Sequence, residues 1–422
     1  MKKIIINGGN KLKGDIYVSG MKNAALPIIF ATILTGDMCS IENLPDVTDV
    51  NLSLDILAAM GAEIRRTGST SVIIDTSKLS PECPDNGMVG RLRGSTYLLG
   101  ALLGRFGDAK VGFSGGCNFG VRPIDQHIKG FQALGADVLN EDDCNHVTAG
   151  AGGLHGGSVY LDIASVGATI NVMLAAVTAR GRTTIDNAAR EPHIVDLANF
   201  LNMCGARITG AGTSFIKIMG VEELHGCSYT IIPDMIEAGT YMAAAAATGG
   251  RVNIKGVIPK HMETVTAKLQ EMGVGVDEKD ESLIVTRSSA LNGTNLKTFF
   301  YPGFPTDMQP QFGALLASAS GTSVITEGVF DSRFRYVEEL AKMKADITVD
   351  GRTATINGVE RLCGAEVKAV DLRAGAALVI AGLAAEGTTV ITGVELIERG
   401  YNDIVGKLRK LGADIRLEDT EE

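Results

Sequence analysis

Six segments of the chain are apolar on most faces, are rich in Ala and Leu, and are each followed by Gly and a short strand-like run. Helices with this composition are buried rather than laid on a protein surface. The predicted helices span residues 23–34, 95–103, 168–179, 238–248, 311–320 and 374–384. The pattern therefore predicts six buried helices, each leading into a short strand.

A second predicted helix in each copy ends in Leu-Gly-Ala or a close variant and leads into a β-hairpin. The central positions of this motif are 61, 135, 205, 273, 344 and 412, which lie 68 to 74 residues apart. Gly directly after a helix is typical of a C′ residue in the left-handed αL conformation. The fifth copy has Lys344 at this position and so lacks the preferred residue.

Six similar copies indicate units that pack on one another. Each unit is expected to contain a helix, a strand, a loop, a second helix and two strands. A period near 70 residues is too long for a solenoid, so we predict two similar halves of three units with a junction near Tyr229 to Pro233. The strands at residues 3–19 can complete the last unit of the second half. The predicted domains are residues 22–229 and residues 1–21 plus 230–422.

Composition narrows the class of protein. The chain has 422 residues and a net charge of −10, with 5% aromatic residues and no Trp. This argues against nucleic acid as a partner. Seven cysteines without a Cys-x-x-Cys pair favour free thiols in a reducing compartment. No signal peptide and no membrane span is predicted, so we expect a cytoplasmic protein without a membrane partner. The sequence gives no indication of an oligomeric state.

The glycine-rich stretch at residues 112–125 carries the most distinctive candidate chemistry. Four glycines flank Cys117, and Arg122 follows five residues later. Glycine allows the backbone to bend at several points, and a nearby cation favours a reactive thiolate. The alternative is a surface hairpin with an unremarkable cysteine.

Polar residues recur at or just before the starts of the buried helices, where free N–H groups can bind anions. They include Lys22 and Asn23, for which the alternative is a solvated lysine and an N-cap. Asp307 is either a general base or a capping residue. His127 is interpreted as a helix-face histidine with a hydrogen-bond partner, and any single arginine is expected at the surface. No metal-binding spacing occurs. The other members of this group are Arg93, Ser165–Gly167 and Asp371–Arg373.

Seven blocks in order resemble the enolpyruvyl transferases that act on UDP-N-acetylglucosamine. The blocks are SGMKNAALP (19–27), GGCNFGVRP (115–123), AAREP (188–192), GFPTDMQ (303–309), RF (333–334), DLRA (371–374) and RGY (399–401). The resemblance implies an α/β fold of two inside-out α/β barrel (prism) domains, each of three βαβαββ repeats. It also implies transfer of the enolpyruvyl group of phosphoenolpyruvate to the sugar 3-hydroxyl with release of phosphate. This reaction is the first committed step of peptidoglycan synthesis, and it needs no metal or organic cofactor.

The resemblance also implies roles for individual residues. Cys117 would donate a proton to phosphoenolpyruvate and react with fosfomycin, and Asp307 would accept the hydroxyl proton. Lys22, Arg122 and Arg399 would hold the phosphate and carboxylate. The implied substrate contacts are Lys22, Asn23, Arg93, Arg122, Pro123, Ile124, Asp125, Gln126, Ser165, Val166, Gly167, Asp307, Val329, Arg333, Asp371, Arg373 and Arg399.

Three positions depart from the family pattern. Met235 stands where an arginine is expected, and Asn118 and Phe119 are bulkier than the usual neighbours of the thiol. Two alternatives are a sister transferase that acts on shikimate 3-phosphate and an inactive paralogue that binds a UDP-sugar. The cysteine loop argues against the first, and the intact set of chemical residues argues against the second.

Overall fold

The computed structural model describes residues 2–84, 86–113, 123–140 and 144–419, which separate into two compact units. The 20–232 unit contains the described residues between these two positions. The 233–419 unit contains these residues together with the N-terminal residues 2–19. The chain therefore passes from one unit to the other at Ser19–Gly20 and again at Ile232–Pro233.

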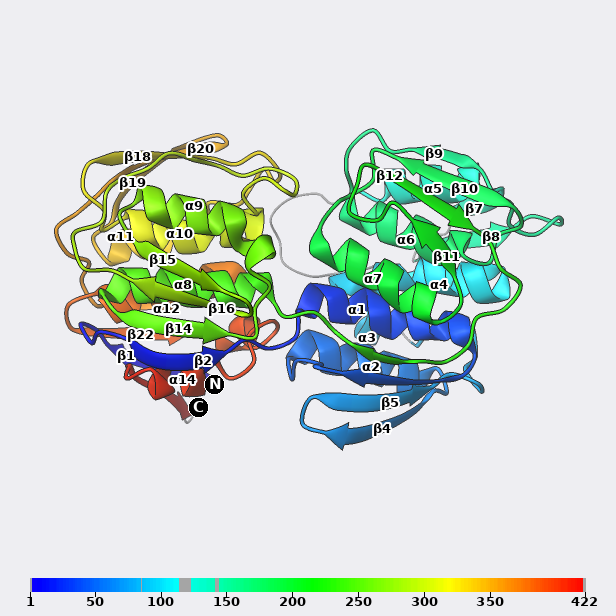
Figure 1. Ribbon diagram of the computed structural model, residues 1–422, viewed down its shortest axis with the longest axis horizontal. Helices are drawn as coiled ribbons and strands as arrows, with labels where there is room; N and C mark the ends of the chain where they lie inside the picture. The colour runs from blue at the N-terminus through cyan, green and yellow to red at the C-terminus, as the bar shows by residue number, and fades with distance from the viewer. Residues whose placement is uncertain (1, 85, 114–122, 141–143, 420–422) are drawn as a thin grey trace. The chain divides into compact units, whose positions relative to one another are not determined.

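Three buried helices form the centre of the 20–232 unit (Figure 1). They are α1 (Lys22–Ala31), α4 (Tyr97–Phe106) and α6 (Val166–Ala176), and α4 packs against both of the others. The second helix of each copy is α2 (Thr48–Ala59), α5 (Asp125–Ala133) or α7 (Pro192–Met203). Shorter helices are η1 (Thr32–Thr35), α3 (Asn86–Val89) and η2 (Arg93–Thr96).

Three sheets complete this unit. In the first sheet the order of neighbouring strands is β13 (Ser228–Thr230), β3 (Met38–Glu42), β5 (Ser71–Asp75) and β4 (Glu63–Gly68). The second runs β6 (Asp108–Gly112), β8 (Cys144–Ala149), β7 (Ala136–Asn140). The third runs β11 (Arg207–Thr209), β12 (Phe215–Met219), β10 (Arg182–Asp186), β9 (Ser158–Tyr160).

The 233–419 unit repeats this organisation. Its buried helices are α8 (Met235–Thr248), α10 (Gln309–Leu316) and α12 (Leu372–Ala384), and each packs against the other two. The other helices are η3 (Pro259–Met262), α9 (Glu263–Glu271), η4 (Thr306–Met308), α11 (Val337–Lys342), α13 (Val394–Ile397) and α14 (Ile404–Lys410). All six predicted apolar helices are thus present and buried.

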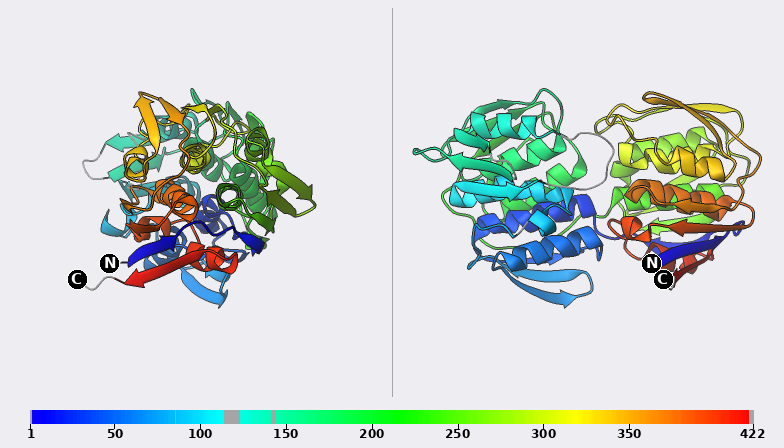
Figure 2. Two further views of the ribbon diagram at one scale, coloured as in Figure 1. Left: turned by 90° about the vertical axis from the view of Figure 1, so that its left-hand side faces the viewer. Right: turned by 180° about the vertical axis from the view of Figure 1, so that it is seen from behind.

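The sheets of the 233–419 unit include both N-terminal strands. In the first sheet the order of neighbouring strands is β21 (Glu366–Lys368), β22 (Thr388–Thr392), β1 (Lys2–Asn7) and β23 (Asp414–Asp419). In the second it is β15 (Gly275–Lys279), β16 (Ser282–Thr286), β14 (Arg251–Lys255) and β2 (Lys13–Tyr17). In the third it is β17 (Leu296–Lys297), β18 (Thr322–Thr326), β20 (Thr353–Asn357) and β19 (Asp346–Asp350). Strand β1 lies antiparallel to β23, beside the C-terminal end of the described chain (Figure 2). The prediction that the first strands complete the last unit of the second half is right for β1 only, because β2 pairs with β14 in the sheet of the first unit of that half.

The backbone confirms the predicted turn in all six copies. Gly61, Gly135, Gly205, Gly273 and Gly412 have φ between 81° and 101°, and Lys344 has φ 70°. Of the six sheets formed by the described residues, five combine one parallel pair with antiparallel pairs. The fold is therefore α/β with mixed sheets, built from repeated units.

Candidate active site

Asp307 lies in the 233–419 unit, on the short turn η4 that precedes the buried helix α10. Pro305 takes the N-cap position of this turn, and no side chain caps it. The alternative of a capping role for Asp307 is therefore wrong. Its side chain is 29% exposed, so one part of the carboxylate faces protein and another part can be reached from outside.

Two arginines hold the Asp307 carboxylate. Nη2 of Arg333 donates to Oδ1 at 2.9 Å, while Nε and Nη2 of Arg373 donate to Oδ2 at 3.2 and 3.0 Å. The residues Arg333 and Arg373 are only 1% and 3% exposed, which corrects the expectation that single arginines lie at the surface. Charge-assisted hydrogen bonds of this kind fix orientation as well as contributing energy.

Arg373 is itself held in place by the start of α12. Asp371 is the N-cap of this helix and accepts hydrogen bonds from the backbone N–H groups of Arg373 and Ala374. The Arg373 guanidinium lies 5.4 Å from the centroid of the Tyr401 ring. Burial works against its charge, but Asp307 outweighs this effect and raises the pKa of Arg373. The guanidinium therefore remains a fixed positive charge beside Asp307.

A buried carboxylate organises the neighbouring loop. Glu327 is 1% exposed, and its Oε1 accepts hydrogen bonds from the backbone N–H groups of Val329 and Phe330 at 2.8 and 3.1 Å. Its Oε2 accepts from the Thr306 hydroxyl at 3.1 Å. Glu327 thus connects Val329, a predicted substrate contact, with the residue next to Asp307.

Arg399 follows α13 and is half-buried, two residues before Tyr401. The Tyr401 hydroxyl bonds to the Thr240 hydroxyl at 2.8 Å and accepts from Gln311 at 3.2 Å. Burial raises the pKa of Tyr401, although Arg373 opposes this effect. Met235 opens α8 after the N-cap Asp234 and is buried, so a neutral side chain occupies that helix start.

Lys22 and Asn23 open the buried helix α1 of the 20–232 unit. The N-cap is Met21, so the alternative with Asn23 as N-cap is wrong. Nζ of Lys22 lies 3.2 Å from Oδ2 of Asp49, and the two side chains are 12% and 5% exposed. The alternative of a solvated Lys22 is wrong as well, because this cation is largely buried and paired.

A second group forms around the start of α6. Ser165 caps this helix by accepting a hydrogen bond from the Ala168 N–H. Gly167 faces His127, since a Cβ at position 167 would lie 2.6 Å from its Nε2. Burial lowers the pKa of His127 to about 4, and the charge of Arg93 adds to this effect. His127 lies on α5 as expected, but within the described residues its Nδ1 has no hydrogen-bond partner.

Asp125 and Gln126 open α5. Gln126 donates to Asp125 at 2.8 Å and to Asp162 at 3.0 Å, and its carbonyl accepts from the Asp162 N–H. Pro123 and Ile124 directly precede this helix. The structure therefore places the predicted contacts of this unit in two groups, one at the start of α1 and one between α5 and α6. Cys117 and Arg122, with Asn118 and Phe119, lie outside the described residues.

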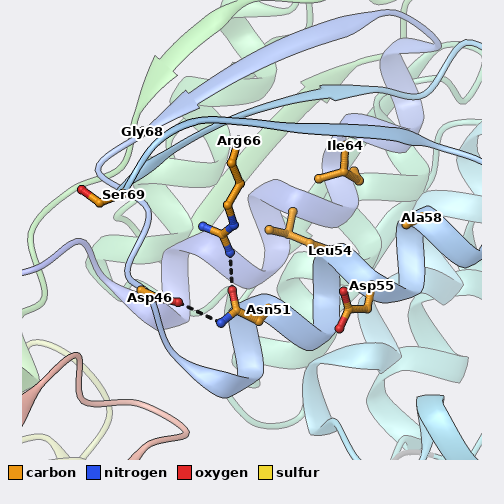
Figure 3. Close-up of a pocket in the computed structure, with 9 residues that line it drawn as sticks. All are labelled: Asp46, Asn51, Leu54, Asp55, Ala58, Ile64, Arg66, Gly68 and Ser69. Carbon is orange, nitrogen blue, oxygen red and sulfur yellow. Dashed lines mark hydrogen bonds between the residues drawn. The ribbon is translucent and has the colours of Figure 1, made fainter.

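A pocket of about 440 Å³ in the 20–232 unit involves none of the predicted residues. It lies between α2 and the β4–β5 hairpin, where Arg66 donates a hydrogen bond to Asn51 and Asn51 donates one to Asp46 (Figure 3). No group of three or more His, Cys, Asp or Glu side chains in the described residues is arranged to hold a metal ion. In the same part of the chain, no helix is both long and apolar enough to cross a bilayer.

Sequence reasoning missed several residues of these groups. Asp49 and Glu327 contact predicted site residues but stand in none of the recognised blocks. Tyr401 is part of the RGY block, which offers a signal, but its contacts with Thr240 and Gln311 are not visible from spacing. These residues act through partners that are distant in sequence.

The chain is similar to known proteins along most of its length. The family model of EPSP synthase (3-phosphoshikimate 1-carboxyvinyltransferase) matches residues 6–408. A UDP-N-acetylglucosamine 1-carboxyvinyltransferase of Clostridium botulinum is 54% identical, over 98% of this chain and 99% of its own. A protein of Geobacillus kaustophilus named UDP-N-acetylglucosamine 1-carboxyvinyltransferase 2 is 53% identical, over 98% and 96%.

Solved structures agree with the fold. The enolpyruvyl transferase NikO of Streptomyces tendae superposes with a TM-score of 0.88 at 28% identity, covering 99% of this chain and 98% of its own. An EPSP synthase of Acinetobacter baumannii superposes with a TM-score of 0.74 at 20% identity, covering 99% and 100%. The second likeness concerns the fold alone.

Proposed function

Since the chain belongs to the EPSP synthase family of enolpyruvyl (1-carboxyvinyl) transferases, we propose that it transfers the enolpyruvyl group of phosphoenolpyruvate to the 3-hydroxyl of UDP-N-acetylglucosamine. One observation carries the choice of acceptor. Relatives named for UDP-N-acetylglucosamine share more than half of their residues with this chain over almost its full length. The reaction releases phosphate.

The proposed chemistry is addition followed by elimination. Cys117 protonates the methylene carbon of phosphoenolpyruvate, and the sugar 3-hydroxyl attacks the resulting cationic carbon while Asp307 accepts its proton. The tetrahedral intermediate then loses phosphate and a proton from the new methyl group, which restores the double bond. Lys22, Arg122 and Arg399 bind the phosphate and carboxylate and stabilise the charge that develops.

The geometry around Asp307 supports its role as the proton acceptor. Arg333 and Arg373 fix both carboxylate oxygens, and a fixed base is more effective than a mobile one because orientation is already established. We propose that Glu327 acts as a positioning residue by holding Val329 next to the acceptor sugar, UDP-N-acetylglucosamine.

The second group of residues supports recognition of the nucleotide sugar. Lys22, Asn23 and Ser165–Gly167 stand at the starts of buried helices, where backbone N–H groups favour anions. Arg93 adds a partly buried guanidinium whose pKa burial lowers. We assign these residues, with Pro123–Gln126, Val329, Asp371 and Arg399, to substrate binding.

The repeated organisation supports a finer description of the fold. We propose that each unit is an inside-out α/β barrel of three βαβαββ repeats, and that the two domains predicted as residues 22–229 and residues 1–21 plus 230–422 correspond to the 20–232 and 233–419 units, whose bounds lie two or three residues away. The proposed reaction places the protein in the cytoplasm at the start of peptidoglycan synthesis, and so in cell-wall formation, cell shape and division.

The proposal is tested by measuring phosphate release with each substrate alone and with both. Release is expected only when phosphoenolpyruvate and UDP-N-acetylglucosamine are present together, and shikimate 3-phosphate should not replace the sugar nucleotide. Folded protein that releases no phosphate would contradict the proposal. Fosfomycin should modify Cys117 when UDP-N-acetylglucosamine is present, which peptide mapping by mass spectrometry can verify.

A further inference from the structure

Three cysteines far apart in sequence meet inside the 20–232 unit. Cys204 is the C-cap of α7, Cys39 lies on β3, and Cys227 directly precedes β13. The Cys204 thiol donates a hydrogen bond to Sγ of Cys227 with a sulfur–sulfur distance of 3.4 Å. Cys39 and Cys204 are fully buried, whereas Cys227 is half-buried. A small reagent can therefore reach Cys227 first.

The backbone already holds the Cys204 and Cys227 segments together. The carbonyl of Cys204 accepts from the His225 N–H at 2.9 Å, and the carbonyl of Cys227 accepts from the Ser40 N–H at 2.9 Å. A disulfide requires a sulfur–sulfur distance of about 2.05 Å, so the two sulfurs must approach by little more than an ångström. Side-chain rotation is the movement that a disulfide would require here, because the backbone on both sides is held by these hydrogen bonds.

The three thiols differ in how readily they lose a proton. Hydrogen bonds from the thiols of Cys204 and Cys227 lower the pKa of Cys39, although burial opposes this effect. The hydrogen bond from Cys204 favours the thiolate of Cys227, but Cys39 and burial together raise the pKa of Cys227 to about 11. A thiolate is the species that reacts with disulfides, so the reaction is expected to be faster at alkaline pH.

We propose that Cys204 and Cys227 form a site of reversible oxidation by low-molecular-mass disulfides such as oxidised glutathione. The Cys227 thiolate attacks one sulfur of the reagent and releases one thiol, leaving a mixed disulfide. The Cys204 thiolate then attacks the Cys227 sulfur and releases the second thiol. The two protein thiols are oxidised, the reagent is reduced, and the two protons end on the released thiols.

The product would link the end of α7 to the start of β13 and enclose residues 205–226, which contain the β11–β12 hairpin. Closing a loop of this length removes conformational freedom from the unfolded chain. The oxidised protein is therefore expected to unfold at a temperature higher by roughly 5–10 °C than the reduced protein.

The experiment treats the full chain with oxidised glutathione, blocks the remaining thiols and maps each cysteine by peptide mass spectrometry. We expect a linked pair of Cys204 and Cys227 peptides without retained glutathione, which a dithiol reductant reverses. Cys363, which is exposed, serves as the internal control and should carry glutathione as a mixed disulfide.

Two variants separate the steps. C204S should trap glutathione on Cys227, because the resolving thiol is absent, whereas C227S should leave the buried Cys204 unmodified. Wild-type protein in which Cys227 retains glutathione while Cys363 reacts normally would overturn the proposal. So would a linked pair containing Cys39, or a failure of the link to form in folded protein. The wild-type mapping decides the question even if a variant does not fold.

Discussion

Asp307→Asn is the substitution that most directly probes the arrangement around the proposed proton acceptor. It keeps the shape of the side chain but removes its charge and replaces one carboxylate oxygen with an amide nitrogen. At least three charge-assisted hydrogen bonds from Arg333 and Arg373 are affected, and such bonds contribute about 1.5–3 kcal/mol each. One acceptor oxygen remains, and the side chain is 29% exposed, which reduces the effect.

We therefore expect D307N to lower the free energy of unfolding by about 3 kcal/mol, the lower end of the range for breaking a buried ion pair. This corresponds to a fall in melting temperature of about 6–12 °C for a unit of this size. Loss of a positioned base should reduce kcat by about 10²–10⁴-fold. Calorimetry and phosphate release measure the two effects.

Asp331→Asn provides a matched control in the same unit. Asp331 pairs with Arg352, but the two side chains are 75% and 49% exposed, and exposed pairs contribute about 0–1 kcal/mol. D331N should therefore melt close to the wild type and retain activity. Equal melting temperatures and equal kcat for the two variants would refute the reasoning about Asp307.

Three further predictions test other parts of the structure. E327Q should raise KM for UDP-N-acetylglucosamine more than it lowers kcat, because weaker hydrogen bonds to Val329 disturb a binding loop; steady-state kinetics checks this, and unchanged constants would contradict it. Burial lowers the pKa of His127 to about 4 in the folded protein, so the side chain is neutral there. Below about pH 6.5 the unfolded chain therefore binds more protons at this residue than the folded protein does, and the free energy of unfolding should fall by about 2 kcal/mol between pH 7 and pH 5. Burial raises the pKa of Asp196 to about 6, which opposes this change because it stabilises the folded protein as the pH falls from 7 to 5. Urea unfolding of H127Q and wild type at both pH values therefore isolates the contribution of His127. Equal pH dependence of the two proteins would exclude that contribution. K344G should stabilise the protein by about 0.5–1 kcal/mol by relieving an αL lysine, whereas G412A at the equivalent turn should destabilise it by about 1 kcal/mol or more; thermal melts compare the two, and shifts of the same sign would refute the assignment.

The sequence predicted the repeated architecture well because its signals are local. A Gly after a helix reports the backbone conformation of that residue alone, and the six predicted positions all have positive φ. Lys344 adopts φ 70° despite its side chain, which indicates that the surrounding hairpin determines the turn even where the preferred residue is absent. Burial of the six Ala- and Leu-rich helices followed from their composition in the same way.

The side-chain network around the site was less predictable. The burial of Arg333 and Arg373 depends on Asp307, which is 26 and 66 residues away in the chain, and a general expectation of exposed arginines failed for both. Glu327 and the Cys39–Cys204–Cys227 cluster have no sequence signal of their own. The cysteine cluster and the Asp307–Arg373 pair join different repeats, and Glu327 contacts Thr306 across 21 residues of one repeat. A pattern read along the chain does not contain these contacts.

The proposed function of this chain is the transfer of an enolpyruvyl group to a nucleotide sugar. The most direct test incubates the protein with phosphoenolpyruvate and UDP-N-acetylglucosamine and determines the mass of the recovered nucleotide sugar together with the phosphate formed. The proposed function predicts a product in which a carboxyvinyl group has replaced one hydrogen, in an amount equal to that of the phosphate. Unchanged UDP-N-acetylglucosamine, or phosphate formed without this product, would contradict it.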